Sequence, residues 1–93
     1  MKELYAKLVH PDWGMDYDKK QVRKVGLEVG RKYRVTSVDM GQSRTDIRLA
    51  GIQGLFNSVQ FEFYDENGQP HDIYNDPDYN PYIELYGDYV DSW

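Results

Sequence analysis

The sequence contains no cysteine, and this absence excludes several kinds of site. Disulfide bonds, zinc sites built on thiolates and catalysis by a thiol nucleophile all require that residue. Long apolar runs are also missing: no stretch approaches the ~20 residues of a membrane span, and no apolar segment follows a basic N-terminus as in a secretory signal. The sequence therefore predicts a cytoplasmic protein that does not contact a membrane.

Large aliphatic residues are scarce, and their scarcity limits the core. Leu, Ile, Val and Phe together number 21 of the 93 residues, and a domain of this length buries only about 60–65% of its unfolded surface. Nine tyrosines and two tryptophans must add packing area, with their polar atoms at the edge of the core. A hydrophobic content of 40% is still typical of a folded chain, so we expect one small domain over residues 1–93.

Basic residues are absent from the second half of the chain. All eleven Lys and Arg lie within residues 1–48, where seven acids leave a net charge of +4, whereas residues 49–93 hold nine acids and have a net charge of −9. An asymmetry of this size bears on the partners of a protein rather than on its fold. The two halves either neutralise one another in the folded molecule or leave a negative surface that attracts a basic partner.

Alternating apolar and polar residues predict short strands rather than long helices. Residues 3–9 form the first strand, and residues 11–30 form a long excursion in which a helix of about nine residues is only marginally stable. The apolar phase of residues 32–40 shifts by one position, which predicts a β-bulge at Thr36 and Ser37. Further strands are predicted at residues 45–50, 59–64, 69–74 and 82–86, with turns at residues 41–43, 51–54 and 66–68. The predicted core consists of Leu4, Leu8, Tyr33, Val35, Val38, Ile47, Leu49, Val59, Phe61 and Phe63.

Residues 30–38, Gly-Arg-Lys-Tyr-Arg-Val-Thr-Ser-Val, resemble the second strand of SH3-like barrels, in which a Gly-x-x-Tyr-x-Val entry follows a long first loop. The resemblance implies a mainly β fold, a single small SH3-like barrel of five to six antiparallel strands with a long first loop. Residues 4–8, Leu-Tyr-Ala-Lys-Leu, do not match the Ala-Leu-Tyr-Asp-Tyr opening of SH3 domains that bind polyproline. Polyproline binding is therefore not expected.

A second resemblance concerns the genomic setting. Residues 56–63, Phe-Asn-Ser-Val-Gln-Phe-Glu-Phe, together with residues 72–74 and 80–82, are similar to small uncharacterised proteins encoded by phages and prophages of Gram-positive bacteria. This resemblance implies a phage origin, but it implies no reaction and no catalytic residue.

Motifs that would carry chemistry are incomplete. Asp76 and Asp78 imitate the start of a calcium loop, but its sixth and twelfth positions, which require Gly and a bidentate Glu, hold proline and glycine. A turn built by Asx side chains is the preferred interpretation. His71 and Asp72 are neighbours on a predicted strand and would point to opposite faces, so they are poorly placed for acid–base catalysis. We expect no catalytic residue, no cofactor and no metal ion, and therefore no enzymatic activity.

Basic residues concentrate in the excursion and the strand that follows it. They are Lys19, Lys20, Arg23, Lys24, Arg31, Lys32 and Arg34. Basic patches interleaved with aromatic residues bind nucleic acids, but the acidic second half would repel a polyanion. We therefore expect these cations to neutralise acids of the chain itself, and we expect no direct nucleic-acid binding.

The last 22 residues interleave carboxylates with tyrosines, which supply contact area at low entropic cost. Either these tyrosines pack a terminal strand onto the fold, or they form an interface for a protein with a basic surface. The candidate protein-binding residues are Asp76, Asp78, Tyr79, Tyr82, Glu84, Tyr86, Asp88, Tyr89 and Asp91.

Three functional hypotheses follow from these observations. The first is a non-enzymatic protein-binding module, a phage or prophage accessory protein. The second is an acidic DNA mimic that inhibits a host nuclease or another defence enzyme, of the anti-CRISPR or anti-restriction type. The third is a structural or assembly component of the virion, which oligomerisation in solution would distinguish from the others.

Overall fold

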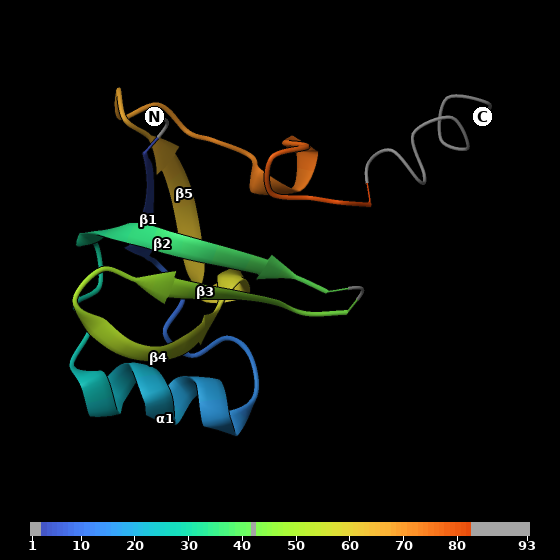
Figure 1. Cartoon of the computed structure of the whole chain (residues 1–93). Coiled ribbons are helices and arrows are strands. Elements are labelled where there is room, and N and C mark those ends of the chain that lie inside the picture. The colour runs from blue at the N-terminus through green and yellow to red at the C-terminus, as the bar shows by residue number, and fades with distance from the viewer. Residues whose placement is uncertain (1–2, 42, 83–93) are drawn as a thin grey trace.

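The structure, a computed structural model, describes residues 3–41 and 43–82. Within them the fold is mainly β, as predicted, with one open antiparallel sheet and one α-helix (Figure 1). The elements are β1 (Leu4–Leu8), α1 (Asp16–Val25), β2 (Lys32–Met40), β3 (Thr45–Leu49), β4 (Ile52–Asn57), the 3-10 turn η1 (Ser58–Gln60), β5 (Phe61–Asp65) and the 3-10 turn η2 (Ile73–Asn75). The helix in these described ranges is too short and too polar to cross a membrane.

The five strands lie in the order β4-β3-β2-β1-β5, and each pairs antiparallel with its neighbours. The first strand of the chain therefore occupies an interior position, between β2 and β5. No pairing joins the outermost strands β4 and β5 over the described residues, so the sheet remains open and the predicted closed SH3-like barrel is not observed. Helix α1 packs beside β4 instead.

A β-bulge interrupts the pairing of β2 with β3. Val35 pairs with Leu49, whereas Ser37 already pairs with the adjacent Arg48. Before the bulge, Tyr33 and Val35 face the core. The extra residue shifts the alternation by one position, so that Val38 and Met40 face the core after the bulge. The predicted bulge is confirmed at the predicted place.

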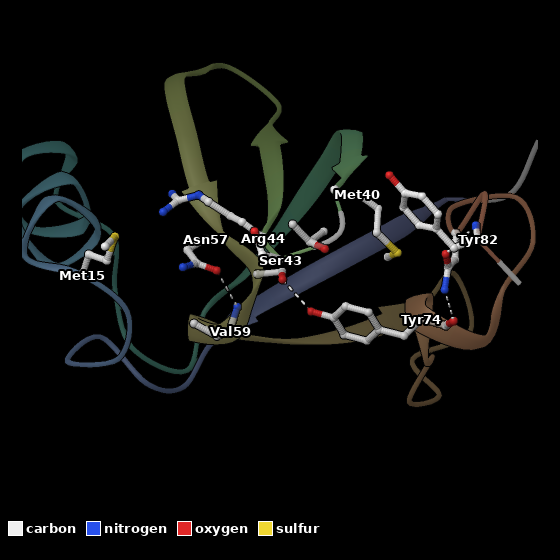
Figure 2. Close-up of a pocket in the computed structure, with 12 residues that line it drawn as sticks. Met15, Met40, Ser43, Arg44, Asn57, Val59, Tyr74 and Tyr82 are labelled. Carbon is white, nitrogen blue, oxygen red and sulfur yellow. Dashed lines mark hydrogen bonds between the residues drawn. The ribbon is translucent and has the colours of Figure 1, made fainter. Parts of the chain in front are cut away.

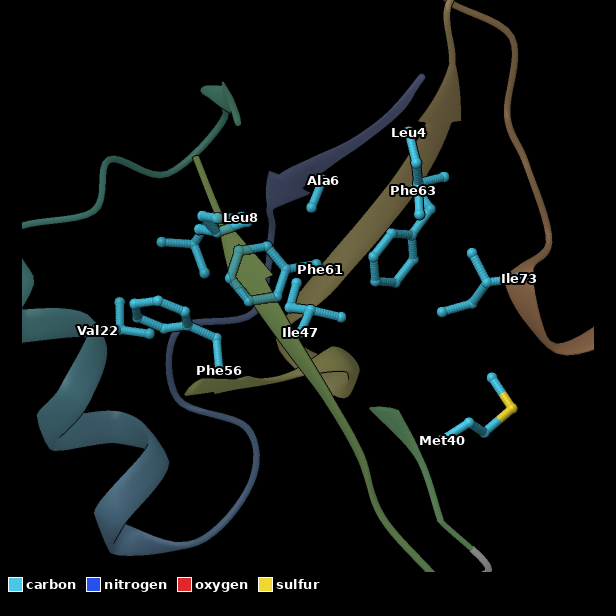
Figure 3. Packing of buried hydrophobic residues seen from close by; sticks show 11 residues of the cluster. Leu4, Ala6, Leu8, Val22, Met40, Ile47, Phe56, Phe61, Phe63 and Ile73 are labelled. Atoms are coloured by element: carbon cyan, nitrogen blue, oxygen red, sulfur yellow. The ribbon is translucent and has the colours of Figure 1, made fainter. Parts of the chain in front are cut away.

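The excursion after β1 contains a ten-residue helix, where the sequence predicted at most a marginal one. Asp18 accepts a hydrogen bond from the backbone N–H of Met15, which precedes the helix, and Gly26 ends it in the left-handed conformation at φ 77°. Val22 is buried beside Phe56 of β4 (Figure 3). Tertiary packing thus stabilises a helix that would be marginal alone.

Two predicted turns and strands differ from the structure. β4 begins at Ile52, inside the segment predicted as a turn, because the chain reverses at Ala50 and Gly51. Residues 69–74 make one bridge, between Tyr64 and Pro70, and then form η2. The strand pairing stops there because Pro70 has no N–H to donate to a longer ladder. The Asp72 side chain then caps η2 by accepting a hydrogen bond from the Tyr74 N–H at 3.0 Å.

The core lies on the inner face of the sheet (Figure 3). Six of the ten predicted core residues are buried, and Tyr33, Val35 and Val38 are half-buried against them. Val59 is 43% exposed, so its placement in the core was wrong. It lies in η1, where the two-residue alternation of a strand does not apply. The core is completed by Ala6, Val22, Met40, Phe56 and Ile73.

Candidate functional site

A groove of about 930 Å³ opens where three connecting segments meet the chain that follows β5 (Figure 2). The turn before α1, the end of the β2–β3 hairpin and η1 form one side, and residues 74–82 form the other. The lining residues are Met15, Met40, Gly41, Ser43, Arg44, Thr45, Asn57, Ser58, Val59, Tyr74, Asn80 and Tyr82.

Apolar side chains are exposed along this groove. Met15 is 70% exposed, Tyr74 44% and Val59 43%. By contrast, the core side chains on the inner face of the sheet are buried. Exposed apolar surface in a concave site is typical of a place where another molecule binds.

The floor of the groove rests on a buried ion pair. The Asp18 carboxylate, whose side chain is fully buried, accepts hydrogen bonds from Arg44 Nη2 at 2.6 Å, Arg44 Nη1 at 3.3 Å and Asn57 Nδ2 at 3.1 Å. The Met15 N–H donates to the same carboxylate at 2.9 Å, and Arg44 Nε donates to Asp46 at 2.7 Å. These contacts join α1 to β3 and β4.

The ion pair is charged at neutral pH. Burial acts to raise the pKa of Asp18, but hydrogen bonds from Arg44, Asn57 and the Met15 N–H outweigh it and hold that pKa below its ordinary value. Hydrogen bonds to Asp18 and Asp46 raise the pKa of Arg44 in turn. The floor of the groove is therefore held by an ion pair that stays charged near neutral pH.

Hydrogen bonds attach the opposite wall to the sheet (Figure 2). The Tyr74 hydroxyl lies 2.6 Å from the Ser58 hydroxyl, and Asn80 Nδ2 donates to the Tyr74 carbonyl at 2.6 Å. Asn80 also accepts from the Tyr82 N–H at 2.9 Å. Since Ile73 is buried in the core beside this segment, the wall has a defined position.

Three polar residues of the groove are hydrogen-bonded within the protein. Ser58, Asn57 and Asn80 each bond to another group of the chain, and none of these bonds pairs a nucleophile with a base. Across residues 3–41 and 43–82, no three His, Asp or Glu side chains are arranged to hold a metal ion.

The sequence-predicted binding residues are only partly in this groove. Tyr82 lines it. Asp76 is buried and lies 2.7 Å from His71 Nε2, so it is not the surface carboxylate that the sequence suggested. Its carboxylate also accepts from the Asp78 N–H at 2.9 Å, the expected Asx turn, and Tyr79 packs edge-on to His71. Glu84, Tyr86, Asp88, Tyr89 and Asp91 lie outside the described residues.

Sequence reasoning missed Asp18, Arg44 and the exposed Met15 and Val59. Asp18 lies three residues after Met15, which is the spacing of a capping interaction, but that spacing does not indicate an ion pair with a distant arginine. Arg44 and Asp18 are 26 residues apart, and no local pattern relates them.

Comparison with known proteins gives one match. A family model described as bacteriophage T4 protein Y07B matches residues 3–85. No curated protein and no solved structure matches the chain.

Proposed function

Because the chain belongs to the family of bacteriophage T4 protein Y07B, it is a phage protein, and we propose that it is a non-enzymatic accessory protein that binds a partner protein in the groove. The family match supports the phage origin implied by the sequence, and it does not bear on a Gram-positive host. The family match gives no reaction that could be assigned to this chain.

The observation that carries the proposal is the exposed apolar lining of the groove. Met15, Val59 and Tyr74 together leave apolar surface in contact with water on a concave site. Removing such surface from water favours association by about 25 cal/mol per Å². Arg44, Asn57, Ser58 and Asn80 beside it are already hydrogen-bonded within the chain.

The charge around the groove favours a partner with a basic surface. Arg44 is balanced by Asp18 and Asp46, so it adds no net positive charge. The wall formed by residues 74–82 carries the exposed Asp78, and the exposed Asp72 lies just before it. The whole chain has a net charge of −5. A basic partner would associate faster at low salt, because exposed charges are screened over about 8–10 Å at physiological ionic strength.

The arrangement of elements supports an SH3-like module in open form. The long excursion follows β1, the sheet order is β4-β3-β2-β1-β5, and η1 alone separates β4 from β5. The groove lies beside the excursion, the β2–β3 hairpin and η1, so it is formed by the connections that vary most easily in such a scaffold.

The two alternatives have less support. A DNA mimic needs a row of exposed carboxylates, whereas Asp76 is buried and Asp72 is engaged in capping η2. A virion component would assemble with itself, and gel filtration with light scattering over a range of concentrations would reveal this.

The test compares groove variants with a matched surface variant. We expect affinity capture from phage-infected cells, read by mass spectrometry, to enrich a basic protein on the wild type. Val59→Glu and Met15→Glu should lose that protein, whereas Val29→Glu, which places the same charge on a 64% exposed valine outside the groove, should keep it. Direct binding of the purified partner should reproduce this order and weaken with salt. Equal capture by all variants would contradict the proposal.

A further inference from the structure

A second exposed surface lies on α1 and on the turn before it, and we infer that it binds single-stranded nucleic acid. We call it the α1 surface and define it by Trp13, Tyr17, Lys20, Arg23 and Lys24, all of which are exposed. This role goes beyond protein binding in the groove and rests on different residues.

The α1 surface has a local surplus of positive charge. Four cations lie within residues 19–24, against the exposed Asp12 and Asp16. Asp18 is buried and already balanced by Arg44, so it does not offset them. The ion pairs Arg23–Asp12 at 3.7 Å and Lys19–Asp16 at 3.9 Å are long and solvent-exposed, and such pairs contribute little.

The helix places its free cations next to an aromatic ring. Lys20 and Lys24 are one turn apart on the same face of α1, and Tyr17 lies one turn before Lys20. No carboxylate within residues 3–41 and 43–82 lies within ion-pair distance of either lysine. Phosphates spaced along a strand would supply the missing negative charges.

Trp13 offers a stacking surface that is already oriented. Its ring lies parallel to that of His10, with the centroids 3.5 Å apart and an angle of 5° between the planes. Since Trp13 is nevertheless 53% exposed, its solvent contact is on the side away from His10. A nucleobase would extend this stack by one layer, as bases do on the aromatic side chains of proteins that bind single strands.

The arrangement of the described residues separates α1 from much of the acidic second half. β5 carries the chain roughly 16 Å along its five residues before residues 66–82, which hold four of the nine acids of that half. In Figure 1 residues 66–82 and α1 lie on opposite sides of the described part of the chain. Because screening acts over about 8 Å at physiological salt, the α1 surface attracts a polyanion despite the net charge of −5.

The composition of the α1 surface favours nucleic acid over an anionic membrane. The surface exposes no Leu, Ile or Phe, which interfacial helices use to enter the acyl region. A flat ring beside separate cations matches base stacking with phosphate contacts.

The test measures binding of a fluorescent oligothymidylate by anisotropy over a salt series. The triple variant, in which Lys20, Arg23 and Lys24 are changed to Gln, should bind at least about tenfold more weakly. Each lost phosphate contact should reduce the slope of log K against log salt by ~0.7, so the three changes together should reduce it by about 2. Trp13→Ala should weaken binding about tenfold with an unchanged slope. The control changes the exposed Lys32, Arg34 and Arg48 to Gln, which alters net charge equally on β2 and β3.

Each outcome decides the inference. Wild-type binding that only the α1 variants weaken supports it, and Val59→Glu should bind the oligonucleotide normally, so failure of the groove proposal would not affect this result. Equal loss in the control triple variant would overturn the inference in favour of a general charge effect. Absence of oligonucleotide binding at low salt would also overturn it, as would binding to phosphatidylserine vesicles alone. Circular dichroism must show that the variants are folded.

Discussion

At the scale of single residues, Asp18 connects the helix to the sheet. Its buried carboxylate accepts hydrogen bonds from Arg44, Asn57 and the Met15 N–H, which come from three separate segments of the chain. A buried charge is tolerated only when its partners compensate the loss of hydration. Removal of the carboxylate would leave several donors without an acceptor at the base of the groove.

We expect Asp18→Ala to lower the free energy of unfolding by about 1–3 kcal/mol, because it leaves the Asn57 amide and the Met15 N–H without their acceptor, whereas Arg44 is partly exposed and keeps its bond to Asp46. Urea denaturation followed by tryptophan fluorescence measures this change. Asp16→Ala is the matched control on the same helix, since the Asp16 side chain is 91% exposed, and it should change stability little. A similar small effect for both variants would show that the ion pair contributes no stability.

The lowered pKa of Asp18 predicts a specific dependence on pH. Its ionised form is favoured in the folded state, so its contribution is fully present above the unfolded pKa of about 3.9 and is lost as pH falls through the lower folded pKa. The stability difference between the wild type and Asp18→Asn should therefore be constant near neutral pH and shrink below pH ~4. Urea midpoints measured for both proteins along an acid series test this. A difference that persists unchanged to pH ~2 would contradict it.

At the scale of elements, a glycine in β4 lies directly under a side chain of α1. Gly54 has φ 111°, and a Cβ built on it would lie 2.1 Å from Gln21 Nε2 of α1. The backbone conformation favours glycine there. An added methyl group would also force the end of the Gln21 side chain to move.

We expect Gly54→Ala to cost about 1–3 kcal/mol more than Gly30→Ala, since overpacking adds to the backbone strain that both variants share. Gly30 also has a positive φ, of 86°, but nothing lies within 4 Å of its added Cβ. Thermal or urea unfolding gives the two costs. Gln21→Ala in the Gly54→Ala background should recover part of the difference, and no recovery would mean that the close approach is not its cause.

The strands were predictable where side chains alternate on a half-buried sheet. The apolar phase of β1 and β3, and the slip around Thr36 in β2, identified the faces correctly because one side of each strand meets the core. The helix was not predictable from residues 16–25 alone, because its stability depends on Val22 packing against β4. Val59 was misplaced because nothing local distinguishes a 3-10 turn from the strand that follows it.

The groove was predictable only through Tyr82. The acidic and tyrosine-rich pattern pointed to the right segment, yet Asp76 is turned inward by His71. Arg44 and Met15 belong to connections whose positions depend on contacts far along the chain. A pattern along the sequence detects neighbours within a few residues, whereas this groove brings together residues as far apart as Met15 and Tyr82.

At the scale of the whole molecule, the fold depends on β1, which joins the outermost strand β5 to β2 and so to the rest of the described sheet. β1 pairs with β2 through Tyr5, Ala6 and Lys7, and all five of its residues pair with β5. The core residues of β5, Phe61 and Phe63, pack on the same side. Strands β1 to β4 therefore do not form a complete sheet and core without β5.

A chain that ends at residue 60 is expected to remain unfolded. It lacks β5, so β1 loses its longer pairing and the core loses Phe61, Phe63 and Ile73. Loss of even one such buried aromatic typically costs about 3–5 kcal/mol, which is comparable to the whole stability of a small domain. Circular dichroism and amide exchange of the shortened chain test this, and a cooperative melting transition with strand signal would contradict it.

The interior position of β1 has a consequence for synthesis. β1 is translated before the other four strands of the sheet, and its partner β5 begins 53 residues after Leu8. At about 5–20 residues per second, roughly 3–11 s pass before that partner is made. During this interval one edge of β1 has no partner, and Lys7 on β1 is the kind of side chain that discourages pairing with other chains. The five-stranded sheet can therefore be completed only after β5 has been translated and has paired with β1.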